Sequence, residues 1–402
     1  MPLPPKTNQQ RGAALIFMLL IVVLGVASLL VNSLNHITLK ISRDQKTTET
    51  LSIAKMALIG DSVAQMPINT AGYLRLPDLG FVIGKTGIIP AEGSAAPNFT
   101  GNTQDYSVIG KLPWRTLGLE PLHDGQGECL WYVVSGRFKN TPSTNILNWD
   151  TPGQINLVDA NENIIANNIA ALIVATGPVL DGQNRTQSDP AYAQCGGNYD
   201  ARNYLDPYVS SNVSEPTNYF SGSLNNRVTT NTFNRLMTME GSAHNNDRFL
   251  LITPDEIFRM VIRRADFSAQ ISSLLKDAYF QSVTIAGKKG TGNVNCDLLD
   301  AVNRSFCKNW LEMLLLTQLP TPSPVSIDGE LTGDCSRVLI FGGMKNATQL
   351  RLSAANKATP ANYLEGVNLA AFATPVALAS SFAGASNFSA NHPGADVMTC
   401  LS

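Results

Sequence analysis

The sequence lacks most of the patterns that identify common enzymes and nucleic-acid-binding proteins. It carries 29 Lys and Arg against 31 Asp and Glu, so no strong basic field exists to attract nucleic acid. Its four histidines have no metal-ligand spacing, and no GxSxG motif, HExxH motif or paired-carboxylate arrangement is present. These absences predict a protein that is not an enzyme, with no catalytic site, no metal, no cofactor and no nucleic-acid partner.

No two cysteines have CxxC spacing, which excludes the usual zinc and thioredoxin-type sites. An even number of cysteines in an exported protein is typical of disulfide bonds. The candidates are Cys129, Cys195, Cys296, Cys307, Cys335 and Cys400. We expect Cys335 to pair with Cys400. If residues 296–312 form one helix, Cys296 and Cys307 are about 16 Å apart along its axis and pair elsewhere, unless the helix breaks.

An uncharged apolar run follows a short basic leader at the N-terminus. Residues 13–31 read AALIFMLLIVVLGVASLLV, and as a helix they would span roughly 28 Å, close to the hydrocarbon thickness of a bilayer. Lys6 and Arg11 precede the run, and the first acidic residue is Asp44, so the positive-inside rule places residues 1–12 in the cytoplasm. We therefore expect a retained membrane anchor. The alternatives are a cleaved secretory signal and a buried core helix.

The junction between leader and apolar run resembles a prepilin leader. Gln10-Arg11-Gly12 stands directly before Ala13-Ala14-Leu15-Ile16-Phe17. In that family a prepilin peptidase cuts after the Gly, which implies cleavage between Gly12 and Ala13. The family motif has Glu five residues after the cut, where this chain has Phe17; subunits similar to the K-type pseudopilin or the X-type minor pilins also lack it. The resemblance therefore implies a structural minor or tip subunit of a type IV pilus or a type II secretion system.

The resemblance also implies a location and a set of partners. The chain would be a single-pass protein of the bacterial inner membrane, with its C-terminal part in the periplasm or in a pilus or pseudopilus. Its partners would be other pilins or pseudopilins, the prepilin peptidase and the inner membrane. Phe17, Leu20 and Leu24 are the candidate contacts of the assembly helix. The alternative is a membrane-anchored periplasmic binding protein or enzyme that enters no filament.

The pattern after the apolar run predicts one long helix from about residue 13 to 66. Ile37, Ile41, Leu51 and Leu58 belong to an apolar series with helical steps, and Pro67 cannot continue the helix. The expected fold is therefore α+β, a transmembrane and stalk helix followed by a β-rich periplasmic head with inserted helices. The expected parts are a leader (1–12), the transmembrane and stalk helix (13–66), a β-rich lobe with long loops (67–250), a helical segment (251–320) and a C-terminal β and loop region (321–402).

Within the head, short apolar runs predict strands and capping residues predict helices. Residues 253–256, Thr-Pro-Asp-Glu, are typical of a helix start, and this helix is expected to reach about Phe280. A second helix is expected over about 296–317. Residues 72–78 and 112–118 resemble turn-rich segments of large prepilin-like proteins. The expected strands are Cys129–Val134, Gln154–Val158, Ile164–Ile165 and Ala170–Ala175.

Two parts of the head resemble each other in sequence. In each part, an apolar triplet is followed by a Gly, a Gln and an Arg at the same spacing. The first part ends in Gln183 and Arg185, and the second ends in Gln349 and Arg351. Two further matches follow in the same order, NYLD at 203–206 with NYLE at 362–365, and FSG at 220–222 with FAG at 382–384. A duplicated unit predicts two related β lobes. Chance similarity between loop residues is the alternative.

Overall fold

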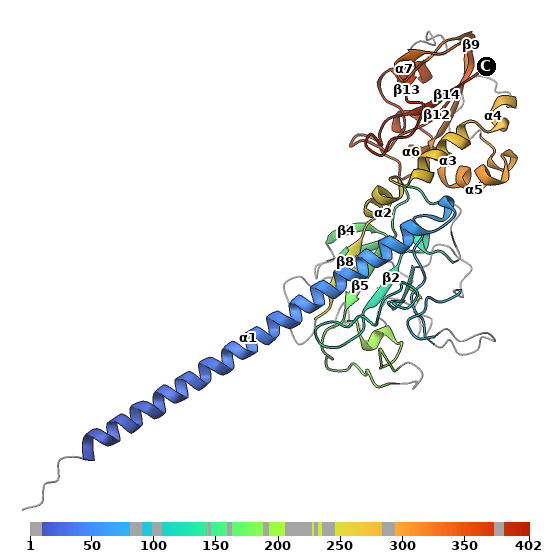
Figure 1. The fold of residues 1–402 in the computed structure, drawn as a ribbon. Coiled ribbons are helices and arrows are strands. Elements are labelled where there is room, and N and C mark those ends of the chain that lie inside the picture. The colour runs from blue at the N-terminus through green and yellow to red at the C-terminus, as the bar shows by residue number, and fades with distance from the viewer. Residues whose placement is uncertain are drawn as a thin grey trace, which may run out of the picture.

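The computed structural model begins with one helix of 55 residues, α1 (Gln10–Ala64), whose N-terminal half projects away from the rest of the molecule (Figure 1). The helix ends shortly before Pro67, which has no amide hydrogen to continue it. The continuous helix expected up to about residue 66 is therefore present. The structure describes residues 10–80, 91–98, 107–141, 143, 146–158, 163–187, 193–205, 227–228, 232–234, 246–283, 294–373 and 382–402.

The expected membrane crossing is corrected by the structure. Among the described residues, no helix combines the length and the apolar character that a membrane span requires. A crossing needs about 20 consecutive apolar residues, whereas the apolar side chains described near the start of α1 are those of Met18–Leu24. The transmembrane assignment of residues 13–31 is therefore wrong. So is the single-pass inner-membrane location with a periplasmic C-terminal part that was inferred from it. The α+β class with β-rich sheets remains.

An antiparallel five-stranded sheet, in the order β6-β1-β2-β5-β8, forms the centre of the N-terminal lobe. Residues of β2 and β5 are buried on both faces, which explains their nearly continuous apolar sequence. Alternate residues join two cores: Tyr132 and Ile173 pack on the same side as α1, and Trp131 and Leu172 pack against a smaller sheet, β4-β3-β7. The main-sheet strands are β1 (Ser107–Lys111), β2 (Trp131–Val134), β5 (Ala171–Ala175), β6 (Arg227–Val228) and β8 (Arg248–Ile252). The smaller sheet contains β3 (Ile155–Val158), β4 (Ile164–Ile169) and β7 (Thr232–Asn234).

The helix expected from residue 253 to about 280 is three helices in the structure. They are α2 (Pro254–Val261), α3 (Ala265–Leu275) and α4 (Ala278–Ser282). Thr253 and Glu256 form the expected capping box at the start of α2. The helix breaks at Arg264, which is extended and donates hydrogen bonds from its guanidinium to the carbonyls of Val63 and Gln65 at the end of α1. A tertiary contact therefore ends a helix that local sequence would have continued.

The helix expected over residues 296–317 is also interrupted. A short 3-10 turn at Cys296–Leu298 is followed by extended Leu299, and α5 (Ala301–Trp310) then starts with Asp300 as its N-cap. The break brings the Cα atoms of Cys296 and Cys307 to 5.6 Å, and the two residues form a disulfide. The remaining disulfides are Cys129–Cys195 and Cys335–Cys400, and the second of these is the pair expected from sequence.

The C-terminal lobe contains a three-stranded antiparallel sheet, in the order β14-β12-β9, and a smaller sheet, β11-β10-β13. A cluster of aromatic side chains joins this sheet to the preceding helices. Its members are Trp149, Trp310, Phe267, Phe341 and Phe388. Figure 1 shows this lobe beyond the N-terminal lobe, away from the free end of α1. Its strands are β9 (Leu314–Ser323), β10 (Ser326–Ile327), β11 (Glu330–Leu331), β12 (Cys335–Phe341), β13 (Ala383–Gly384) and β14 (Val397–Leu401), and its helices are α6 (Ala354–Lys357) and α7 (Gly366–Ala373).

The two lobes repeat the same topology. In each, three antiparallel neighbours lie in corresponding order, β2-β5-β8 and β9-β12-β14. Each has an antiparallel pair inserted between the first two strands, β3-β4 and β10-β11, and the first strand of that pair bonds in parallel to a late strand, β7 or β13. The duplication expected from the sequence therefore extends to a whole six-strand unit. The match at 220–222 lies outside the described residues.

Candidate assembly surface

The N-terminal half of α1 exposes large apolar side chains. Met18–Leu24 are each between 52% and 72% exposed, which includes the sequence-predicted contacts Leu20 and Leu24. Ile37, Leu39 and Ile41 are also more than half exposed. Gly12 and Ala13 lie in the first turns of α1, but their side-chain surroundings and those of Phe17 are outside the described residues. A contiguous apolar helix surface of this kind is typical of a site that another apolar surface covers.

The C-terminal part of the same helix is docked on the head. Leu51, Ala54 and Leu58, at helical spacing, are at most 6% exposed and belong to the core that includes β5. Ion pairs flank this seam: Lys55 Nζ lies 2.5 Å from Glu256 Oε1 at the start of α2. Burial alone would raise the pKa of Glu256, but hydrogen bonds from Lys55 and Thr253 outweigh it and lower that pKa. Among the described residues, the head therefore holds α1 by its C-terminal part.

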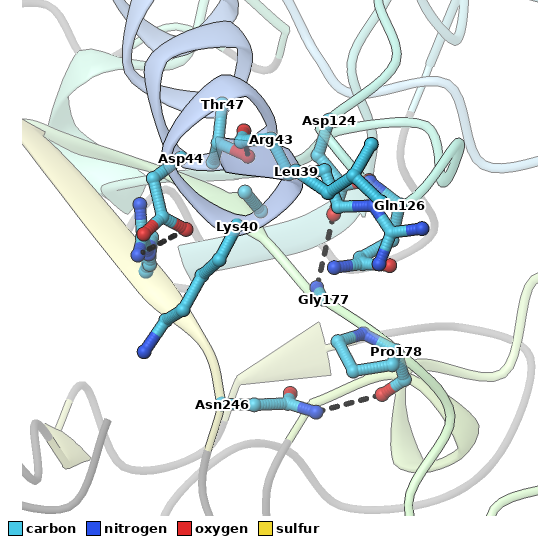
Figure 2. Close-up of a pocket in the computed structure, with 12 residues that line it drawn as sticks. Leu39, Lys40, Arg43, Asp44, Thr47, Asp124, Gln126, Gly177, Pro178 and Asn246 are labelled. Atoms are coloured by element: carbon cyan, nitrogen blue, oxygen red, sulfur yellow. Dashed lines mark hydrogen bonds and ion pairs between the residues drawn. The ribbon is translucent and has the colours of Figure 1, made fainter. Parts of the chain in front are cut away.

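A polar cleft of about 550 Å³ lies where α1 leaves the head (Figure 2). One wall is α1, with Arg43 and Asp44, and the opposite wall is the end of β5 and the start of β8. Asp44 Oδ1 accepts a hydrogen bond of 2.9 Å from Arg248, while Asp124 accepts one from the backbone N–H of Gly177. The first bond joins α1 to the start of β8, and the second joins two loops beside the helix.

The two turn-rich segments 72–78 and 112–118 lie next to a buried lysine, Lys111. Backbone hydrogen bonds of 2.9 Å join Asp78 and Lys111 in both directions, and the Lys111 ammonium donates to the carbonyl of Gly196. That ammonium also lies 4.6 Å from the centre of the Tyr199 ring. Burial lowers the pKa of Lys111 to about 8, although nearby carboxylates oppose the shift. Because these bonds join the end of β1 to the segments around Asp78 and Gly196, we interpret this cluster as structural.

The first of two duplicated arginines, Arg185, organises the loop after β5. Its guanidinium donates to the carbonyls of Gly177 and Asn203 and to the side chain of Gln183, and it stacks 4.9 Å from the ring centre of Tyr204. These are the sequence-matched residues of the first repeat. An ion pair of 3.3 Å to Glu128 completes the site.

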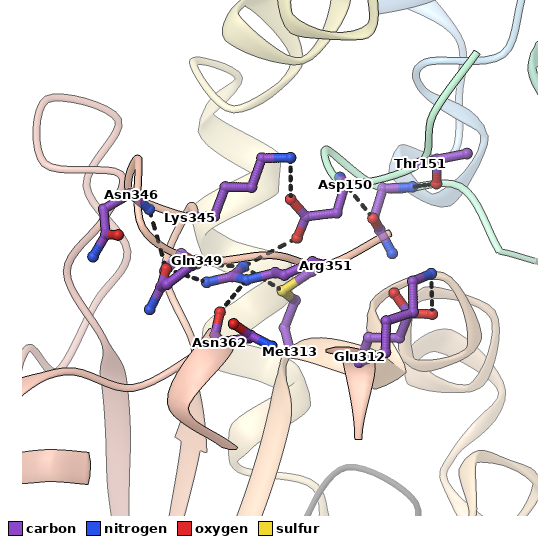
Figure 3. Close-up of polar contacts among 12 residues, drawn as sticks. Asp150, Thr151, Glu312, Met313, Lys345, Asn346, Gln349, Arg351 and Asn362 are labelled. Atoms are coloured by element: carbon purple, nitrogen blue, oxygen red, sulfur yellow. Dashed lines mark hydrogen bonds and ion pairs between the residues drawn. The ribbon is translucent and has the colours of Figure 1, made fainter. Parts of the chain in front are cut away.

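The second arginine, Arg351, makes the equivalent bonds after β12 (Figure 3). It donates to the carbonyls of Gly343 and Asn362 and to the side chain of Gln349, and it lies 4.4 Å from the ring centre of Tyr363. Its carboxylate partner differs, because Asp150 comes from the N-terminal part of the chain rather than from the same repeat. The repeated bonds stabilise each loop, and the second site also joins the two lobes.

Sequence reasoning missed two features of this surface. Asp150 precedes the matched segments in the sequence and has no counterpart in the repeat, so no sequence signal connected it with Arg351. Gly60 lies inside α1, where it faces solvent. A glycine within a helical pattern is itself a signal, because it costs stability and calls for a packing reason.

Comparisons of the chain with protein-family models, with curated proteins and with solved structures found no match. Within the ranges described above, no group of His, Cys, Asp and Glu side chains is placed to hold a metal ion. Function is therefore inferred from α1 and from the surfaces around it.

Proposed function

We propose that this chain is a structural subunit of a pilin-like or pseudopilin-like filament and that it assembles through the N-terminal half of α1. The observation that carries the proposal is the division of one helix into two parts. The C-terminal part is buried in the head at Leu51, Ala54 and Leu58, while Met18–Leu24 project from it with more than half of each side chain exposed. The exposed part needs apolar neighbours, and the described residues of this chain do not supply them.

The energy of assembly comes from burial of these side chains. Fully covering one Leu, Ile, Val or Met side chain contributes about 1.5–3 kcal/mol. Several such contacts in one helix bundle together exceed the cost of lost translational and rotational freedom, which is on the order of 4–15 kcal/mol. The heads then lie around the bundle and determine the contacts with other components.

The N-terminal sequence supports a minor or tip position in such a filament. A prepilin peptidase would cut between Gly12 and Ala13 and leave the apolar helix on the mature protein. Phe17 stands where ordinary pilins have the Glu that is thought to neutralise a neighbouring subunit's N-terminal amine. Without that carboxylate, this chain cannot pair with the amine of a neighbour, and an end position, where no such pairing is needed, suits it best.

The processing step is tested by co-expression of the full chain with a prepilin peptidase, followed by N-terminal sequencing. We expect mature protein that starts at Ala13. The control is Gly12→Leu, which removes the small residue before the cut and should leave the chain at full length. Wild-type protein that stays at full length in the presence of an active peptidase contradicts the proposal.

A further inference from the structure

A second surface, separate from the projecting half of α1, has the form of a helix-binding groove. The last turns of α1 and the helix α2 enclose an open groove of about 790 Å³ on the head. Its apolar lining is contributed by Met56, Ile59 and Val63 of α1 and by Met260 of α2. Met56 is 67% exposed and Met260 is 46% exposed, so both methionines are available to a partner.

The two walls are fixed to each other, and their side chains recur at helical spacing. Met56, Gly60 and Val63 follow one another at steps of four and three residues, so they share one face of α1. The opposite wall is fastened to α1 by the Lys55–Glu256 ion pair and by the hydrogen bonds from Arg264 to the end of α1. A groove between two fixed helices, with ridges at helical spacing, suits a third helix.

Gly60 indicates that this third element approaches α1 closely. A glycine within a helix costs roughly 0.5–1 kcal/mol relative to alanine. Within the described structure nothing explains that cost, because a Cβ built on Gly60 would meet no atom within 4 Å. The residue faces the groove, where the missing side chain lets another backbone approach. Among the described residues nothing accounts for the glycine, and a partner that approaches α1 does account for it.

The charge along the groove determines which partner fits. Arg263 is exposed and has no partner among the described residues, whereas Arg259 forms an exposed pair with Asp255. The one acidic group in the lining, Glu256, is already paired with Lys55. The rim is therefore positive, and it complements acidic side chains that flank an apolar stripe. The polar part of a second copy's α1 fits less well, because its cations Lys40, Arg43 and Lys46 outnumber its acids Asp44 and Glu49.

We propose that the groove between α1 and α2 binds an amphipathic helix of another protein in the same assembly, with acidic residues beside its apolar face. The partner's apolar residues pack on Met56, Val63 and Met260, its backbone approaches Gly60, and a carboxylate pairs with Arg263. The identity of the partner as an assembly component rests on the function proposed above. The flexible methionine side chains adapt to its apolar residues.

The test uses the full chain and two synthetic helical peptides of 18 residues with the same Leu and Ala face, one flanked by Glu and the other by Lys. Fluorescence anisotropy should show at least ten-fold tighter binding of the Glu peptide. Gly60→Trp should abolish that binding, while Thr321→Trp, at an exposed position of β9 in the C-terminal lobe, should leave it unchanged. Arg263→Glu should reverse the preference between the two peptides. Equal binding of both peptides, or binding that survives Gly60→Trp, overturns the proposal.

These results are distinguishable from a failure of the proposed function. The peptide assay concerns only the head, and it does not involve Met18–Leu24. If the groove binds the Glu peptide as described but the projecting part of α1 contacts no other subunit, the groove stands and the assembly proposal fails. If the helix assembles but the peptides do not discriminate, the groove proposal alone fails.

Discussion

The guanidinium Nη1 of Arg351 lies 3.0 Å from Oδ2 of Asp150, and both side chains are at most 1% exposed. The pair links the loop after β12 to a segment that precedes β3 in the sequence, so it connects the C-terminal lobe to the N-terminal part of the chain. Arg185, the equivalent residue of the first repeat, instead pairs with Glu128, whose side chain is 24% exposed. The same local motif is thus used once within a lobe and once between lobes.

The first prediction concerns this difference. Removing one partner of a buried ion pair typically costs about 3–5 kcal/mol, and without Arg351 the buried Asp150 carboxylate keeps only the longer, 3.8 Å contact to Lys345. Arg351→Ala should therefore lower the free energy of unfolding by an amount in that range, measured by urea denaturation. Arg185→Ala should cost less, because water can solvate the remaining Glu128. Arg263→Ala, at an exposed and unpaired position, is the control and should change stability little. Equal losses for Arg185→Ala and Arg351→Ala would contradict the interpretation of Arg351 as an inter-lobe link.

The second prediction concerns the pH dependence of stability. Burial raises the pKa of Asp396 from 3.8 to about 6, although hydrogen bonds from Asn368 and Gly343 oppose the shift. Between these values the folded chain holds a proton that the unfolded chain has lost. The contribution of Asp396 to stability is therefore present below pH 4, decreases as the pH rises to about 6, and is lost above it. Its full size is on the order of 3 kcal/mol.

Urea denaturation of the wild type and of Asp396→Asn at several pH values checks this. The variant has no titrating group at this position. The unfolding free energy of the wild type should therefore fall relative to that of the variant as the pH rises from 4 to 6. Above pH 7 the difference between the two proteins should be constant. A difference that does not change across this range would show that the Asp396 carboxyl titrates near its ordinary pKa.

The third prediction concerns the disulfides. The Cys296–Cys307 bond closes a loop with a sequence separation of 11, whereas Cys335–Cys400 has a separation of 65. By loop-closure entropy, the short loop contributes about 3 kcal/mol and the long loop about 4 kcal/mol. The double serine variant of each pair, measured by urea denaturation, should follow this order. A larger loss from the short loop would mean that native-state packing, not chain entropy, determines the effect.

The fourth prediction separates stability from binding at Gly60. Gly60→Ala adds a Cβ in open space on a helix, so it should raise the free energy of unfolding by about 0.5–1 kcal/mol. Gly118 is the matched control. A Cβ there also meets nothing within 4 Å, but its φ of +69° is unfavourable for alanine, so Gly118→Ala should destabilise the protein. Stabilisation by Gly60→Ala together with weaker binding of the Glu peptide would show that the glycine is retained for a partner. If Gly60→Ala destabilises the free chain, the cost of this glycine has been misjudged.

The parts of the fold that the sequence predicts best are those determined by local pattern. The apolar runs around Trp131, Leu157 and Ile173 are strands, and Thr253 caps a helix, because periodicity and capping act within a few residues. The repeat was detectable because Arg185 and Arg351 need the same surrounding loop to satisfy five N–H donors. Residues that build one hydrogen-bonded unit keep their spacing even when the loops between them differ.

The parts that the sequence did not predict depend on distant contacts. The break at Arg264 exists because its guanidinium bonds to carbonyls at the end of α1, nearly two hundred residues earlier in the sequence. Leu314–Leu316 continue an apolar run that suits a helix equally well, and they are strand because β12 pairs with them. The transmembrane assignment was wrong for a different reason. It was made from the apolar pattern of residues 13–31 alone, and among the described residues no helix is long and apolar enough to cross a membrane.

The assembly proposal is tested most directly by photo-crosslinking from α1 in cells that produce the other subunits. A photoreactive amino acid at Leu20 or Leu24 should crosslink to the N-terminal helix of another pilin-like subunit, identified by mass spectrometry of the joined peptides. The same group at Thr321, an exposed residue of β9 in the C-terminal lobe, should give no such product. If Leu20 and Leu24 yield no crosslink to another subunit's helix while those subunits are present and assembled, α1 is not an assembly helix.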